Sequence, residues 1–340
     1  DGSLTDMAPE LNVRTRVHEY GGGAWNVRGG VLVFSEFDDN RLLLKRSPDG
    51  AVEELVGDPA LRFADIEIDL ERDRAVAVLE DQTESAIEAR NLLVAVSLAD
   101  GSMRELVTGH DFFSDPRLSP DGRHLAWLSW DFPNMPWDGT DLWVAPIAED
   151  GSVGDPAHVA GGVAESIAQP RWAPDGSLVY ASDRSDWWNL YRWRQGASGS
   201  AEIAPMEAEI GGPQWVFGLS EYDVDDDGTI VAFANGPEGS SLLALRQGEA
   251  PRRIATDAMA CSYLRAQDGF LTCVMSSPTS PSAIVRLELE GDRSERLRES
   301  STLDVDAAHL SMPELISFPS SGGRTAYALS LIHILTLPTT

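Results

Sequence analysis

Two interleaved series of Asp-Gly pairs run along the chain with a period near 50 residues. The pairs of one series are 51 and then 50 residues apart: Asp49-Gly50, Asp100-Gly101 and Asp150-Gly151. Those of the other are 54 and then 52 residues apart: Asp121-Gly122, Asp175-Gly176 and Asp227-Gly228. An Asp-Gly pair between short β-rich runs is a strong local signal for a β-hairpin. Two hairpin turns per period predict a repeated four-stranded unit, which is the blade of a β-propeller.

Six such units can be followed along the sequence. They cover residues 18–56, 63–108, 112–161, 165–205, 209–256 and 261–300. No apolar pattern of helical period extends beyond about two turns, so a helical fold is not indicated. The predicted fold class is therefore all-β, a β-propeller of four-stranded blades with six recognisable blades. The alternative is a set of unrelated hairpins or a β-sandwich, in which two in-phase series of turns would have to arise by chance.

The charge balance limits the partners to expect. The chain has 55 Asp and Glu against 26 Lys and Arg, which is a formal net charge of −29. Such a surface repels phosphate backbones, so nucleic acid is not an expected partner. No apolar run approaches the roughly 18 residues of a membrane span, so no membrane partner is expected either. A cytoplasmic location is the default expectation.

Neither the cysteines nor the histidines indicate a metal or a cofactor. Cys261 and Cys273 are too few for a disulfide framework, and a metal site would need further ligands. Both lie in apolar, strand-like sequence, where buried thiols are common. The histidines show no metal-ligand spacing, and we expect each to be a surface or turn residue: His18, His110, His124, His158, His309 and His333.

Four segments carry a resemblance to a known family. In chain order they are VRTRVHEYGGG at residues 13–23, PNMPWDGTDLWV at 133–144, DRSDWWNLY at 183–191 and PQWVFG at 213–218. Together they resemble the prolyl oligopeptidase family of serine peptidases, in its dipeptidyl-aminopeptidase and acylaminoacyl-peptidase-like branch. The resemblance covers residues 11 to 328. It implies a propeller followed by an α/β-hydrolase domain, and seven blades in the complete protein.

The catalytic part of that family is not recognisable in this sequence. The family's nucleophile sits in a G-x-S-x-G turn of the hydrolase domain, and no such turn is present. We therefore predict no catalytic residue in this chain, and the missing α/β-hydrolase domain becomes an expected partner. The predicted domains are a remnant of a first blade (1–17), the propeller blades (18–307), strands leading into the hydrolase domain (308–328) and a non-native, adapter-derived tail (329–340).

Two segments supply candidate substrate-binding residues. Glu19 and Tyr20 precede three glycines, whose backbone freedom suits a close approach. In related dipeptidyl peptidases propeller glutamates hold a substrate's free amino group, and the resemblance implies this role for Glu19. The other reading of Glu19 is a structural salt bridge to Arg14 or Arg16.

The second segment is a loop that contains two prolines. Its candidates are Asn134, Trp137 and Asp138, which could instead pack between blades. Large aromatic side chains are expected to fill the wedges between blades: Trp172, Trp187, Trp188, Tyr191 and Trp215. The alternative is that they form a hydrophobic wall for substrate side chains.

Three functions remain open at this point. The first is the substrate-gating propeller of a serine exopeptidase that hydrolyses short peptides. The second is a stand-alone propeller that binds or scaffolds other proteins. The third is a propeller enzyme with its own central site, which would need a metal cluster or a carboxylate pair on the inner strands. The expected ligand is a short peptide, and a homo-oligomer stays open.

Overall fold

The computed structural model describes residues 5–85, 87–303, 305–306 and 309–331. Within them the regular structure is β-strand, with two short 3-10 turns at Leu70–Arg72 (η1) and Ser321–Gly323 (η3). In the part of the chain described, no helix is long and apolar enough to cross a membrane. The predicted all-β class is confirmed.

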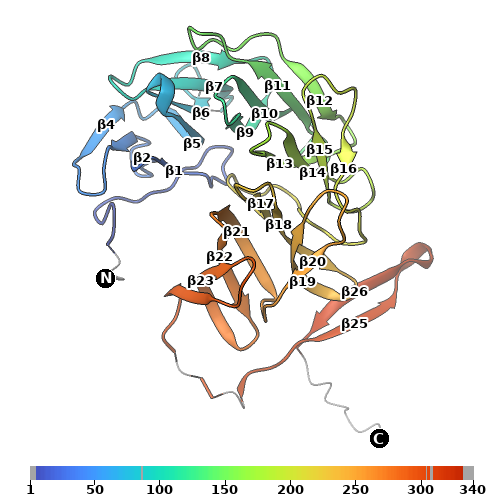
Figure 1. The fold of residues 1–340 in the computed structure, drawn as a ribbon. Helices are drawn as coiled ribbons and strands as arrows, with labels where there is room; N and C mark the ends of the chain where they lie inside the picture. The colour runs from blue at the N-terminus through green and yellow to red at the C-terminus, as the bar shows by residue number, and fades with distance from the viewer. Residues whose placement is uncertain (1–4, 86, 304, 307–308, 332–340) are drawn as a thin grey trace, which may run out of the picture. The chain divides into compact units, whose positions relative to one another are not determined.

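Each blade is a four-stranded antiparallel sheet whose strands follow one another in chain order (Figure 1). The first two blades are β1 (Trp25–Arg28), β2 (Val31–Ser35), β3 (Leu42–Lys45) and β4 (Val52–Val56), then β5 (Leu61–Asp69), β6 (Arg74–Asp81), β7 (Arg90–Ser97) and β8 (Met103–Val107). The third and fourth are β9 (Phe112–Leu118), β10 (His124–Trp130), β11 (Asp141–Pro146) and β12 (Ala157–Gly161), then β13 (Ile167–Trp172), β14 (Leu178–Ser182), β15 (Asn189–Trp193) and β16 (Ala201–Glu202).

The last two blades complete the six that the described residues contain. They are β17 (Tyr222–Val224), β18 (Ile230–Gly236), β19 (Gly239–Leu245) and β20 (Arg252–Ile254), then β21 (Ala260–Gln267), β22 (Phe270–Ser277), β23 (Ser280–Glu288) and β24 (Ser294–Glu299). A separate hairpin follows, formed by β25 (Glu314–Pro319) and β26 (Thr325–Ser330). The strand pair expected after the propeller is therefore present. Residues 332–340 of the expected tail lie outside the described part.

The chain divides into two compact units. Unit 1 holds residues 1–203 and 211–219, and unit 2 holds residues 204–210 and 220–340. Blades one to four belong to unit 1, and blades five and six belong to unit 2 together with the final hairpin. The pocket and the polar cluster described below lie entirely in unit 1.

Apolar side chains from neighbouring blades form the core of each unit. In unit 1, Phe63 of β5 packs with Val33 and Leu44 of the first blade, and Tyr180 of β14 packs with Leu128 of the third. In unit 2 the corresponding cluster includes the buried, unpaired Cys261 and Cys273, as predicted for small apolar thiols. Within each unit, neighbouring blades thus bury apolar faces against one another, which a single blade could not do alone.

The predicted turns lie where the sequence placed them. Gly122, Gly176 and Gly228 have φ values of 66°, 75° and 84°, the left-handed region that glycine reaches without strain. Strands β9 and β10, β13 and β14, and β17 and β18 flank these turns. In one of them the Asp175 carboxylate accepts hydrogen bonds from the backbone N–H and the hydroxyl of Ser177, at 3.0 and 2.5 Å. This side-chain bond fixes the turn.

The fifth blade is interrupted near its start. Glu209 forms an isolated antiparallel bridge with Asn235 of β18, and residues 204–210 belong to unit 2 together with this blade. Residues 211–219 belong to unit 1, where Gly22 and Phe217 form an isolated parallel bridge, and β17 begins only at Tyr222. The sequence Gly211-Gly212-Pro213 favours this interruption, because glycine and proline weaken strand pairing.

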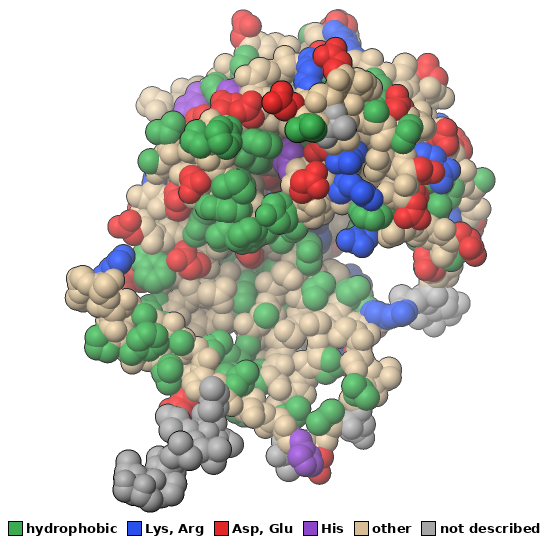
Figure 2. Space-filling view, turned by 180° about the vertical axis from the view of Figure 1, so that it is seen from behind, with side chains coloured by type: hydrophobic (Ala, Val, Ile, Leu, Met, Phe, Trp, Pro, Cys, Tyr) green, Lys and Arg blue, Asp and Glu red, His purple; other side chains and the backbone are tan. Residues whose placement is uncertain are grey.

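The surface carries the charge imbalance read from the sequence. On the face shown in Figure 2, acidic side chains are spread widely. Hydrophobic side chains gather in one area of that face, and acidic groups lie around it. Large exposed apolar residues are also numerous, and several of them belong to the loops of unit 1: Tyr20, Phe132, Met135, Val163 and Trp215. Exposed apolar surface of this kind marks candidate binding regions.

Candidate functional site

The innermost strands of three successive blades each contain a β-bulge. The pairing register shifts at Ala64/Glu67 on β5, at the corresponding place on β9, and at Ala168/Arg171 on β13. At each bulge one residue has a positive φ: Asp65 (50°), Asp115 (51°) and Gln169 (54°). A bulge re-aims the side chains around it. The result is a set of polar side chains on inner strands that are otherwise apolar.

Two of these bulge residues form an ion-pair cluster with Arg117. Nη2 of Arg117 lies 2.9 Å from Oδ1 of Asp65 and 2.7 Å from Oδ1 of Asp115. The backbone N–H of Asp115 donates to Oδ2 of Asp65 at 2.6 Å. Burial raises the pKa of Asp115, and the positive charge of Arg117 opposes that rise. One guanidinium therefore links two buried carboxylates from neighbouring blades.

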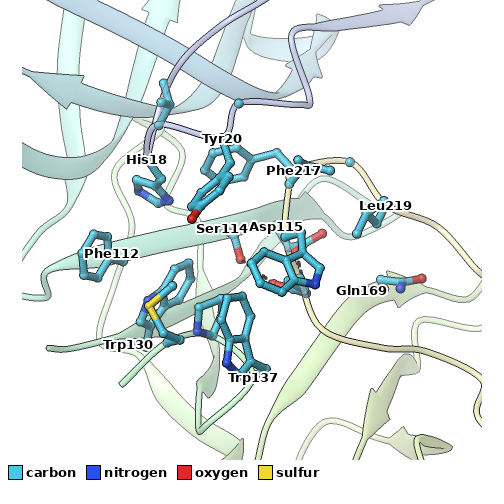
Figure 3. A pocket seen from close by; sticks show the side chains of 18 residues that line it. His18, Tyr20, Phe112, Ser114, Asp115, Trp130, Trp137, Gln169, Phe217 and Leu219 are labelled. Carbon is cyan, nitrogen blue, oxygen red and sulfur yellow. Dashed lines mark hydrogen bonds between the residues drawn. The ribbon is translucent and has the colours of Figure 1, made fainter. Parts of the chain in front are cut away.

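A cavity of about 190 Å³ opens beside this cluster. Figure 3 shows aromatic rings around it and Ser114 and Asp115 of β9 between them. The rings of Phe112 and Trp130 are stacked at 5.5 Å, and those of Trp137 and Trp215 lie 4.4 Å apart. The residues that line the cavity are Val17, His18, Tyr20, Gly21, Phe112, Ser114, Asp115, Trp130, Met135, Pro136, Trp137, Gln169, Gln214, Trp215, Val216, Phe217, Gly218 and Leu219.

His18 forms part of this aromatic wall. Its ring lies 5.1 Å from that of Phe112 and 4.9 Å from that of Phe217. Burial lowers the pKa of His18 to about 4, although an interaction with Asn91 and the charge of Asp65 oppose this effect. The imidazole is therefore neutral at pH 7 and adds no charge to the cavity. As expected, the backbone of His18 lies in a turn, with φ 53°. Its ring, however, forms part of the cavity wall.

The glycine triplet brings two distant segments together at the cavity. Phe217 donates its backbone N–H to the carbonyl of Gly21 at 2.9 Å. Gly22 has φ 90°, and a Cβ at this position would lie 2.4 Å from the carbonyl oxygen of Phe217. Only glycine permits so close an approach of the two backbones. The triplet thus sets the segment with Trp215 beside the segment with Tyr20.

Solved structures of two enzymes are similar to this chain over nearly all of its length. Puromycin hydrolase is 32% identical with a TM-score of 0.85, and the match covers 94% of this chain and 52% of the hydrolase. A puromycin-hydrolysing peptidase of Mycobacterium tuberculosis is 30% identical with a TM-score of 0.86, covering 96% of this chain and 53% of that one. Prolyl oligopeptidase B from Galerina marginata shares the fold at 12% identity, with a TM-score of 0.68 over 90% of this chain and 46% of that one.

The chain shares the propeller fold of prolyl oligopeptidase B, and it is similar in sequence as well as in structure to the two puromycin-hydrolysing enzymes. The chain spans about half the length of these two enzymes. No protein-family model and no curated protein matches it.

The candidates from the glycine-triplet segment lie at two different places in this propeller. Tyr20 lines the cavity, with its ring 6.0 Å from that of Trp215. The Glu19 side chain is 82% exposed, and its Oε1 lies 3.7 Å from a guanidinium nitrogen of Arg62. The contact with Arg62 is a salt bridge of the kind expected in the alternative reading of Glu19, but with a different partner. The guanidinium groups of Arg14 and Arg16 lie over the ring of Phe37, at 4.8 and 4.1 Å.

The candidates from the proline loop also separate. Trp137 lines the cavity, whereas Asn134 and Asp138 hold the loop itself. Nδ2 of Asn134 donates to the carbonyl of Val163 at 3.1 Å, and the Asp138 carboxylate accepts from the Met135 N–H at 2.9 Å. These contacts support the loop that carries Trp137.

Trp215 is 54% exposed and lines the cavity, in line with the alternative of a hydrophobic wall rather than with packing between blades. Sequence reasoning does not find Ser114, Asp115 and Gln214, which also line the cavity. One sequence pattern could have indicated Asp115. On inner strands a polar residue recurs two positions before a charged one, as in Asp65-Ile66-Glu67 and Asp115-Pro116-Arg117.

Proposed function

We propose that this chain is the substrate-gating propeller of a serine peptidase that hydrolyses short peptides from the amino end. One observation carries the proposal: nearly the whole chain superposes on about half of a puromycin-hydrolysing peptidase at 30% identity. Acyl transfer needs a nucleophile, a base and oxyanion donors held together. The sequence offers no nucleophile turn of the family type, so the reacting groups would come from the other half of the protein.

The role proposed for the propeller is selection and orientation of the substrate. A wall of blades admits short, flexible peptides and excludes folded proteins. The aromatic cavity of unit 1 then offers apolar surface to one substrate group. Holding a substrate in a productive orientation lowers the barrier even when the binding element does no chemistry.

Glu19 is proposed to hold the free amino group of the substrate. Its carboxylate is exposed and follows the cavity residue His18 directly in the chain. In the complete enzyme, Glu19→Gln should weaken hydrolysis of peptides with a free amino group about tenfold, as for a lost charge-assisted hydrogen bond. Hydrolysis of the same peptides with a blocked amino end should change little. Glu53→Gln on β4 is the matched control, since Glu53 is exposed and pairs with Arg46 away from the cavity.

The decisive experiment recovers the coding sequence that follows residue 328 and assays the complete product. Puromycin, short peptides and acylated peptides would be tested in parallel. The proposal expects a downstream serine in a G-x-S-x-G turn and hydrolysis that is lost when this serine is replaced by alanine. A reading frame that ends without such a turn would favour the stand-alone binding module instead.

A further inference from the structure

The cavity of unit 1 has an exposed aromatic mouth and a buried polar interior. At the mouth, the Tyr20 and Trp215 side chains are 61% and 54% exposed. Inside, Ser114, Asp115 and Gln169 are only 3%, 6% and 2% exposed. A ligand entering from solvent would therefore meet rings first and hydrogen-bonding groups last.

The size of the cavity suits one ring. Apolar cavities of about 150 Å³ accept benzene, and this one measures about 190 Å³. His18, neutral at pH 7, contributes a flat, uncharged face to the wall. Aromatic pairs prefer edge-to-face or offset contacts with centroids about 4.5–7 Å apart, and rings already in the wall adopt such contacts. A further ring can join this arrangement, whereas a long aliphatic or charged side chain gains less from it.

On the side that faces the cavity, the polar side chains Ser114, Asp115 and Gln214 contact one another only at long hydrogen-bond distances. Oδ2 of Asp115 lies 3.4 Å from Nε2 of Gln214, and Oε1 of Gln214 lies 3.5 Å from Oγ of Ser114. Ordinary hydrogen bonds of these types span about 2.5–3.2 Å. By contrast, Oδ1 of Asp115 is firmly bound to Arg117 at 2.7 Å. An incoming donor can therefore replace Gln214 at Oδ2 at little cost, while Arg117 keeps the carboxylate in place.

We propose that this cavity is a binding site for one aromatic amino-acid residue, with its ring among Trp137, His18 and Phe217 and a hydrogen-bond donor of the same residue on Asp115. The donor can be a phenol hydroxyl, which leaves the free amino group to Glu19, or it can be the amino group itself, which would then bind Asp115 in place of Glu19. That the residue belongs to a peptide substrate rests on the proposed function. The ring specificity and the role of Asp115 do not.

Calorimetric titration of the 340-residue chain with small amides tests the site. The probes are phenylalaninamide, tyrosinamide, their N-acetyl forms and leucinamide. We expect both aromatic amides to bind about tenfold more tightly than leucinamide. A phenol donor would make N-acetyltyrosinamide bind about tenfold more tightly than N-acetylphenylalaninamide, and an amino donor would make phenylalaninamide exceed its N-acetyl form by a similar factor.

Two variants with matched controls locate the binding. Trp137→Ala should abolish the preference for aromatic probes, whereas Trp25→Ala, at an exposed tryptophan outside the lining, should not. Asp115→Asn should remove the advantage of the donor-bearing probe but keep binding of the others. Asp121→Asn, in the exposed turn after β9, is its control. Should Asp115→Asn fail to fold, the five probes on the unmodified chain still decide the question.

The possible outcomes separate the two proposals. Equal binding of leucinamide and phenylalaninamide would overturn the aromatic site. Equal binding within both donor pairs would overturn the role of Asp115. Tight aromatic binding combined with a complete protein that hydrolyses no peptide would leave the site standing and remove the peptidase function.

Discussion

Replacing Arg117 by leucine is the sharpest test of what holds the inner strands together. The guanidinium binds Asp65 at 2.9 Å and Asp115 at 2.7 Å, and the three side chains are 12%, 4% and 8% exposed. Arg117→Leu removes the cation that binds both buried carboxylates, and only the weaker effect of the Arg171 charge on Asp115 remains. Removing one partner of a buried ion pair costs about 3–5 kcal/mol. For a unit of this size the loss corresponds to a fall in melting temperature of roughly 10 °C.

The pH dependence of the variant follows from the same cluster. Burial raises the pKa of Asp115, and Arg117 counteracts this, so its removal raises that pKa further. A carboxyl group whose folded pKa exceeds its unfolded value disfavours folding at high pH, and this effect fades as the pH falls toward the unfolded pKa. The stability difference between wild type and Arg117→Leu should therefore be smaller at pH 5 than at pH 7.5.

Thermal unfolding followed by circular dichroism at these two pH values measures both effects. Arg90→Leu is the control, because Arg90 pairs with Glu105 on the surface with both side chains about half exposed. Such pairs contribute about 0–1 kcal/mol. A loss for Arg117→Leu no larger than that for Arg90→Leu, or one that does not shrink at pH 5, would refute the role assigned to the cluster.

Two further predictions concern a glycine and the pocket histidine. Gly161→Ala should unfold the third blade or lower the free energy of unfolding by several kcal/mol, because the added Cβ would lie 1.9 Å from the carbonyl oxygen of Thr140. Gly176→Ala is the control, since Gly176 also has a positive φ but its Cβ would have no atom within 4 Å. Urea denaturation should show a loss of only about 1 kcal/mol for this control. In a proton NMR titration His18 should change protonation at about pH 4, and its signal is identified by its loss in His18→Gln; a midpoint above pH 6 would contradict the buried, neutral ring.

The propeller could be predicted because its signal is local and repeated. In most of the Asp-Gly turns, such as those at Gly122, Gly176 and Gly228, glycine has a positive φ. The aspartate side-chain cap and glycine's backbone freedom make such turns visible in two adjacent letters. The assignment of residues 211–219 to unit 1 could not be predicted in this way. Residues 211–219 contain no repeat signal, and their place in unit 1 depends on the bridge from Gly22 to Phe217.

The site was only partly predictable for a related reason. Tyr20 and Trp137 lie in segments that differ visibly from the blade repeat, a glycine triplet and a double-proline loop. In the sequence, Trp215 looks the same as a tryptophan that packs between blades. Only its ring contacts with Trp137 and Tyr20 in the structure distinguish it. Asp115 occupies a bulge on an inner strand, where the period-2 pattern that sequence reasoning relies on is interrupted.

The bulges on β5 and β9 also link the stability of the blades to the geometry of the cavity. Asp115 uses one carboxylate oxygen to bind Arg117 and turns the other toward Gln214 and the cavity. A substitution that loosens Arg117 would therefore free Asp115 to move, and the cavity would lose its fixed acceptor before the blades came apart. Since Asp65 and Asp115 come from neighbouring blades, the geometry of the cavity depends on the packing of β5 against β9. Milder changes at that contact, which leave the fold intact, should appear first as a loss of discrimination among aromatic ligands.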